Sequence, residues 1–179
     1  MNLKRALYTI LLCGNLGIVN ATVCNEVPGG VTCGKGIADN LYGNGIVNVH
    51  GTTVTGPTSV NGLLHAEDVN FASLDVNGNV KLIHCTINKI SNIKGTLNAT
   101  STQFEDSLEI YSNSTKFINS KVSSNLYVRR IDTQKQSVYL DNFSEISGDI
   151  IFAGGHGEVI IRGNSKIGGK VVGGKILFK

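Results

Sequence analysis

Pairs of apolar or small residues at positions i and i+2 recur through this sequence from Val47 to Phe178, with polar residues and glycine between them. Successive pairs begin five to seven residues apart over most of that range, as in Val47/Val49, Thr52/Val54 and Thr58/Val60. In a β-strand, residues i and i+2 lie on the same face, so each pair predicts a strand of about three to five residues. The repeat therefore predicts many short strands that point into one continuous core.

Every third pair begins one turn of a coil. The first residues of these pairs are Val47, Leu64, Val80, Leu97, Thr115, Val138, Val159 and Ile176. The turns they define are 17, 16, 17, 18, 23, 21 and 17 residues long. Three short strands per turn predict a triangular cross-section, and stacking of turns about 4.8 Å apart pairs the backbone of each turn with its neighbours. We therefore predict an all-β, single-domain triangular β-solenoid, or parallel β-helix, of about seven coils over residues 47–179.

The second face of each coil supports this register because small and large residues keep separate positions. Its leading residues are Thr52, Val69, Cys85, Thr102, Ser120, Ser144 and Ser165. The residues two positions later are Val54, Phe71, Ile87, Phe104, Val122, Ile146 and Ile167. We expect a column of small residues at a corner beside a column of larger apolar residues in the core.

Residues 1–21 have the pattern of a signal peptide. Lys4 and Arg5 precede the apolar run 6–13, and residues 19–21 fit a signal-peptidase site with cleavage after Ala21. The apolar run is too short for a transmembrane helix. A lipoprotein signal that uses Cys13 is the alternative, although Leu12 is large for such a site. We expect a secreted or periplasmic protein whose mature chain has no integral membrane segment.

Residues 22–46 lack the repeat and contain several glycines, so we predict an N-terminal cap over the first coil. A short helical turn near 36–41 would place Ile37 and Leu41 on the core. Cys24 and Cys33 flank a turn-rich stretch, and an exported chain meets an oxidising compartment, so we predict a disulfide between them. Cys85 lies in the column of small residues, which predicts a buried free thiol.

The charge of the chain excludes several function classes. Without residues 1–21, 14 basic residues face 13 acidic ones, and no basic stripe with interleaved aromatic residues is present. We therefore expect no nucleic-acid partner. No Cys or His recurs at a spacing typical of metal ligands, so we predict no metal site and no cofactor.

Two corners between the third and first faces are longer than the others and occur in successive coils. They are residues 129–137 and 153–158, and we expect them to stack at one edge of the solenoid. Loops on a rigid scaffold often carry function, although such corners also tolerate insertion without function. The candidate binding patch, for an anionic glycan or a host or cell-surface protein, consists of Arg129, Arg130, Asp132, Lys135, His156 and Glu158.

Segments 145–152 (EISGDIIF) and 166–176 (KIGGKVVGGKI) resemble the glycine-punctuated repeats of bactofilins, a family of polymer-forming bacterial cytoskeletal proteins. The resemblance implies a β-solenoid whose subunits polymerise without nucleotide. The signal peptide, the cysteines and the cap differ from the usual bactofilin pattern. Independently, residues 157–176 form the most regular part of the repeat, which gives the hypothesis of self-association through the C-terminal coil.

A catalytic role is the remaining alternative, because β-helical enzymes often cleave acidic polysaccharides. Such chemistry needs two closely placed carboxyl groups, or a basic residue with a calcium cluster. Asp75, Glu109 and Asp149 fall near the third face, but successive members are predicted to lie two coils, or about 10 Å, apart. We therefore predict a non-catalytic binding, adhesion or virulence-associated surface module of a bacterium, with a bactofilin-like polymer subunit and a small polysaccharide-active enzyme as alternatives.

Overall fold

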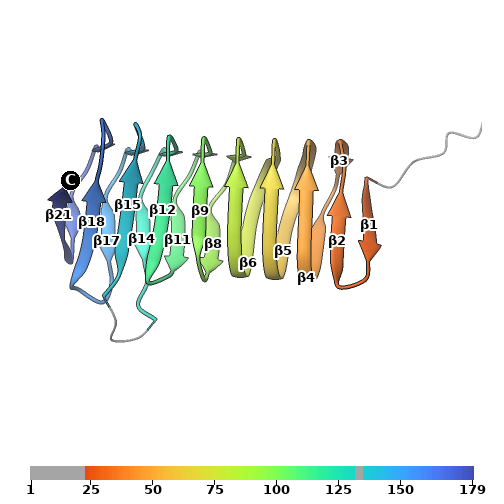
Figure 1. Ribbon diagram of the computed structural model, residues 1–179, viewed down its shortest axis with the longest axis horizontal. Coiled ribbons are helices and arrows are strands. Elements are labelled where there is room, and N and C mark those ends of the chain that lie inside the picture. The colour runs from red at the N-terminus through yellow and green to blue at the C-terminus, as the bar shows by residue number, and fades with distance from the viewer. Residues whose placement is uncertain (1–22, 132–134) are drawn as a thin grey trace, which may run out of the picture.

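The computed structural model describes residues 23–131 and 135–179, and every regular element in these ranges is a β-strand. The strands stack into one straight rod, with β1 at one end and β21 at the other (Figure 1). The predicted signal peptide and Asp132 lie outside the described residues. The strands are β1 (Cys24–Val27), β2 (Gly30–Cys33), β3 (Gly36–Ala38), β4 (Leu41–His50), β5 (Thr52–Glu67), β6 (Asn70–Ile83), β7 (Thr86–Ile87), β8 (Ser91–Lys94), β9 (Leu97–Thr100), β10 (Gln103–Phe104), β11 (Leu108–Tyr111), β12 (Ser114–Ile118), β13 (Lys121–Val122), β14 (Leu126–Val128), β15 (Ser137–Asp141), β16 (Glu145–Ile146), β17 (Ile150–Phe152), β18 (Gly157–Ile161), β19 (Lys166–Ile167), β20 (Val171–Val172) and β21 (Gly174–Phe178).

Parallel pairing between successive turns confirms the predicted β-solenoid and its register. Leu64 pairs with Val80, Val80 with Leu97 and Leu97 with Thr115, and the same column continues to Ile176. The column also extends toward the N-terminus, because Val47 pairs with Val31. The solenoid therefore has about nine turns where we expected about seven.

One extra turn, which begins at Val31, comes from the segment that we predicted to be a separate cap. β3 pairs with β5 in the ordinary parallel register, so the helical turn expected near 36–41 is wrong. Leu41 is buried as expected, whereas Ile37 points outward and is 69% exposed. Gly43 occupies an inward position, and a Cβ there would lie 2.3 Å from Val47 Cγ2, so this coil uses glycine where later coils use valine or isoleucine.

The N-terminal end of the rod is closed by a disulfide-bonded hairpin. β1 pairs antiparallel to β2, with Cys24 opposite Cys33, and the predicted disulfide joins these two residues. All other strand pairs in the described residues are parallel. β1 thus covers the main-chain edge of β2, which would otherwise be open to pairing.

Large apolar side chains fill the interior along the whole axis. Phe71, Phe104 and Phe117 are fully buried, and the rings of Phe104 and Phe117 make an edge-to-face contact with centroids 6.2 Å apart. Because each coil contacts only its neighbours, this single column of side chains is the core of the protein.

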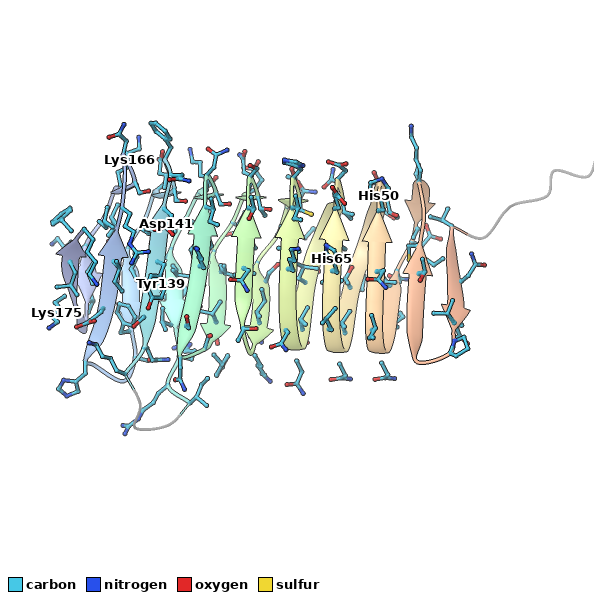
Figure 2. The ribbon with its side chains drawn as sticks, viewed as in Figure 1. His50, His65, Tyr139, Asp141, Lys166 and Lys175 are labelled. Atoms are coloured by element: carbon cyan, nitrogen blue, oxygen red, sulfur yellow. A yellow bond between two sulfur atoms is a disulfide. The ribbon has the colours of Figure 1, made fainter. Side chains whose placement is uncertain are left out.

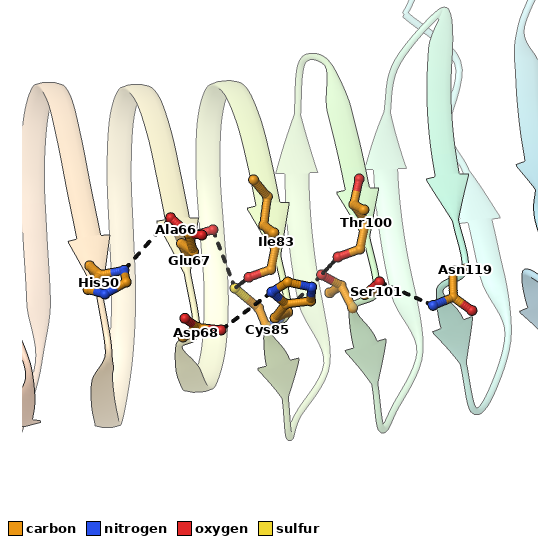
Figure 3. Close-up of polar contacts among 11 residues, drawn as sticks. His50, Ala66, Glu67, Asp68, Ile83, Cys85, Thr100, Ser101 and Asn119 are labelled. Atoms are coloured by element: carbon orange, nitrogen blue, oxygen red, sulfur yellow. Dashed lines mark hydrogen bonds and ion pairs between the residues drawn. The ribbon is translucent and has the colours of Figure 1, made fainter.

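The corner between the first and second faces carries the predicted column of small residues. The backbone N–H groups of Cys85, Thr102, Ser120 and Ser144 each donate to the side-chain hydroxyl one coil further on. Residues just before this column adopt positive φ, which turns their side chains outward while the small residues turn inward. Figure 3 shows the result at Cys85, whose thiol lies against the carbonyls of Ala66 and Ile83. Cys85 is a buried free thiol as predicted, and burial raises its pKa.

The corner between the third and first faces is tight in the first half of the rod. Gly45, Gly62, Gly78 and Gly95 follow one another there with positive φ. A Cβ on Gly78 would lie 1.8 Å from the carbonyl oxygen of Gly62, so only glycine fits this close stacking. The glycine column ends at Gly95, and the long corners begin beyond it on the same edge of the rod.

Candidate functional site

The described parts of the two long corners lie side by side, as their positions in the repeat predicted. β14 pairs with β17 and β15 pairs with β18, so the segments that join these strands stack in successive coils. Between them and the last coil is a hollow of about 570 Å³, which we call the corner hollow. Its lining residues are Arg130, Lys135, Gln136, Gly154, Gly155, His156, Gly157, Glu158, Gly173, Gly174 and Lys175.

Glu158 lies at the centre of the charges in the corner hollow. Its side chain is almost fully buried, with Oε2 contacting Lys135 Nζ and Oε1 lying 3.1 Å from Lys175 Nζ. The ammonium of Lys135, followed by that of Lys175, holds the pKa of Glu158 below its usual range. Both lysine side chains are more than half exposed. Each lysine is therefore positioned by Glu158 and still open to solvent, where a ligand can reach it.

Five of the eleven residues that line the corner hollow are glycines. Gly157 and Gly174 stack on the ring of Phe152, and a Cβ on either glycine would lie within 3 Å of that ring. Gln136 is buried at the base, where its amide donates to the carbonyls of Ser112 and Arg129 at 2.9 and 2.7 Å. The lining residues include no apolar side chain larger than glycine, which suits a polar ligand.

The predicted patch is only partly gathered in the hollow. Arg130, Lys135, His156 and Glu158 all line it. Arg129 turns away, because its Nε lies 3.0 Å from Glu109 Oε1 and its guanidinium stacks over the ring of Tyr127. Asp132 lies outside the described residues.

Lys175 belongs to the hollow, although sequence reasoning did not include it. Figure 2 shows its side chain at the C-terminal end of the rod, where β21 pairs with β18. In that register Lys175 lies directly beside Glu158. The predicted pairing of Val159 with Ile176 could have identified Lys175, because it also places Glu158 and Lys175, the residues just before them, side by side.

Two further acids in the last three coils also lie between cations. Each bridges a basic residue from the coil before and one from the coil after, on the outer side of the rod. Asp141 lies between Lys116 and Arg162, and Glu145 lies between Lys121 and Lys166. These ion pairs lie on other parts of the surface, and neither acid lines the corner hollow. Glu158, between Lys135 and Lys175, is the acid with two cations that does line it.

Two further groups of titratable side chains are divided between the surface and the core or between separate coils. Asp68 Oδ1 lies 3.4 Å from His84 Nδ1 at the surface, but the Cys85 thiol faces the core on the opposite side of the sheet. Asp75 and Glu109 lie two coils apart, each paired with Asn92 of the intervening coil. The described residues contain no group of three or more His, Cys, Asp or Glu side chains that would suit a metal ion.

Two properties bear on where the protein resides. The Cys24–Cys33 disulfide is typical of an oxidising, non-cytoplasmic compartment. Within the described ranges, no helix is long and apolar enough to cross a membrane.

Comparison with protein-family models, with curated proteins and with solved structures gives no match for the chain.

Proposed function

We propose that this protein is a secreted, non-catalytic surface module that binds an anionic ligand in the corner hollow. The observation that carries the proposal is the pair of exposed ammonium groups that Glu158 positions at the edge of a 570 Å³ cavity. Arg130 adds a further positive charge and His156 an imidazole ring to the lining. Even with the charge of Glu158 included, the lining favours an anion.

The rigidity of the scaffold supports this role. The backbone on both sides of the hollow is held by strand pairing, and Gln136 ties the longer corner to the coil before it. Such a site requires little ordering of the protein when a ligand binds, so more of the interaction energy appears as affinity. Attachment to a glycan or to a protein of a host or cell surface is the use that we propose for it.

The test is a binding screen of the full chain against acidic and neutral glycans and acidic surface proteins. Lys135→Ala combined with Lys175→Ala should abolish retention of the acidic ligands. Lys81→Ala combined with Lys89→Ala removes the same charge from exposed sites elsewhere and should leave retention unchanged. Equal retention by both double variants, or the absence of any acidic ligand, would refute the proposal.

A second candidate function is a structural subunit that associates through the last coil, as the bactofilin resemblance implies. Ile176 and Phe178 occupy inward positions there but are 41% and 78% exposed, whereas their partners Val159 and Ile161 are buried. β19, β20 and β21 each pair on one side only in the described chain. Exposed apolar residues beside open strand edges favour pairing with another molecule.

Analytical ultracentrifugation tests this candidate. The protein should form larger species as its concentration rises, and Phe178→Asp should prevent them. Phe143→Asp changes another exposed phenylalanine, on a different corner and 67% exposed, and serves as the control. A protein that remains monomeric over a wide concentration range would exclude association through the last coil.

A further inference from the structure

The corner hollow is one end of a longer row of basic side chains on the same edge of the rod. Lys94 is the last residue of β8 and pairs with Tyr111 of β11. One coil further, the backbone N–H of Arg129 donates to the carbonyl of Ile110, which places Arg129 beside Tyr111. The basic edge, as we define it, consists of Lys94, Arg129, Arg130, Lys135, His156 and Lys175.

We propose that the ligand of the basic edge is a linear polyuronate, a saccharide chain with one carboxylate per sugar unit, which lies along the rod axis from the corner hollow to Lys94. This inference rests on the proposed function, because it takes the hollow as the binding site. It adds the chemical class of the ligand, the direction in which the ligand lies and two binding residues outside the hollow, Lys94 and Arg129.

The length of the basic edge suits an oligomer better than a small ion. Lys94 and the far end of the hollow, at Gly173, are separated by four coil steps, from β8 through β11, β14 and β17 to β20. At about 4.8 Å per step this is about 19 Å. A sugar unit is similar in length to one coil step, so successive carboxylates of an extended polyuronate fall at similar intervals to the coils.

The charges along the edge favour a polyanion. Among the described residues of the edge, five permanent cations, together with His156, face the acids Glu109 and Glu158. Glu109 accepts two contacts from Arg129, near 3.0 and 3.1 Å, and so fixes the direction of the guanidinium. A guanidinium has five N–H donors, so Arg129 retains donors for a ligand carboxylate.

The aromatic residues of this edge argue against a nucleic acid. The ring of Tyr111 lies under Lys94 Nζ at 5.7 Å, and that of Tyr127 lies under Arg129 at 5.5 Å. The hydroxyl of Tyr111 donates to Glu109 at 2.8 Å. Rings that are covered by cations do not offer the open faces on which bases stack. The charged and amide side chains that line the hollow suit the carboxylate and hydroxyl groups of a sugar instead.

Titration calorimetry of the full chain with oligogalacturonates of two, four and six units tests the inference. Affinity should rise at least about tenfold from the dimer to the hexamer, because the longer chain reaches additional cations. Lys94→Ala should weaken hexamer binding about three- to tenfold and leave dimer binding unchanged, in line with the loss of one exposed charge contact. Lys89→Ala, an exposed lysine on another corner, is the matched control and should change neither.

The possible results separate the inference from the proposed function. If dimer and hexamer bind equally, or if Lys94→Ala has no effect on the hexamer, the extended ligand is refuted. The proposed function still stands in that case if Lys135→Ala weakens dimer binding. If neither oligomer binds, the polyuronate is refuted, and the proposed function is decided by the screen of the other acidic ligands. If the oligomers bind but Lys135→Ala has no effect on either, the hollow is not the site and both proposals fail. Tighter binding of a single-stranded oligothymidylate than of the hexamer would refute a polyuronate as the ligand.

Discussion

Ser120→Ala should destabilise the protein far more than the loss of one small polar group on a surface would. Ser120 is 3% exposed, and its hydroxyl oxygen accepts from the backbone N–H of Thr102 at 3.1 Å. The hydroxyl lies 2.8 Å from the carbonyl of Ile118 and can donate to it. Alanine removes both contacts and takes the side-chain acceptor away from the buried N–H of Thr102.

The size of the effect follows from these two losses. A lost hydrogen bond costs about 1 kcal/mol, and a buried N–H without a partner costs about 1–3 kcal/mol more. We therefore expect the free energy of unfolding to fall by about 2–4 kcal/mol. The change in volume is small, so it adds little to this figure.

Urea denaturation followed by circular dichroism measures the difference. The midpoint should shift while the slope m stays constant, because the surface exposed on unfolding is unchanged. Hydrogen exchange at the Thr102 amide should also become faster relative to the amide of Phe104. Ser123→Ala is the control, since its hydroxyl only approaches Glu105 at the surface, 3.4 Å away, and its effect should stay within about 0.5 kcal/mol. Equal effects of the two substitutions would refute the structural role of the hydroxyl column.

Three further outcomes are expected. Gly78→Ala should cost at least about 1–3 kcal/mol, because alanine is strained at positive φ and its Cβ meets the carbonyl of Gly62; thermal melting measures this. Cys33→Ser should lower stability by about 2–5 kcal/mol in non-reducing buffer, and dithiothreitol should then have no further effect on the urea midpoint. The Arg129 guanidinium lowers the pKa of Glu109 in the folded protein. The stability that this pair contributes is therefore present above the ordinary glutamate pKa and is lost as the pH falls through the lower pKa of the folded state. In urea midpoints measured over a pH series, Glu109→Gln should reduce this loss of stability at acid pH.

The register of the solenoid was predictable because inward and outward residues differ in kind over most of the chain. The first turn was missed because its inward positions include Ala38 and Gly43, which carry no apolar signal of their own. Glycine there reflects the close approach of Val47, a contact that only the folded coil reveals. Pattern reasoning therefore fails where backbone packing replaces side-chain burial.

In the candidate site, too, the repeat pattern predicts the positions of the corners but not the contacts that side chains make in the folded protein. Counting along the repeat correctly placed both long corners on one edge of the rod. The direction of Arg129 was not predictable, because it depends on Glu109, which lies 20 residues earlier and one coil away. Lys175 was predictable from the register of its neighbour Ile176, had the pairing been extended from inward to outward residues.

The antiparallel hairpin at the N-terminus makes the two ends of the solenoid differ in how readily they unfold. A stack whose turns contact only their neighbours loses structure turn by turn, starting wherever an edge is least covered. β1 and the disulfide close the edge of β2, while β19, β20 and β21 have no partner on their outer side in the described chain. Within the described chain, the turns should therefore unfold in sequence from β21. This would separate Lys175 from Glu158 and remove the corner hollow before the turns near β4 unfold.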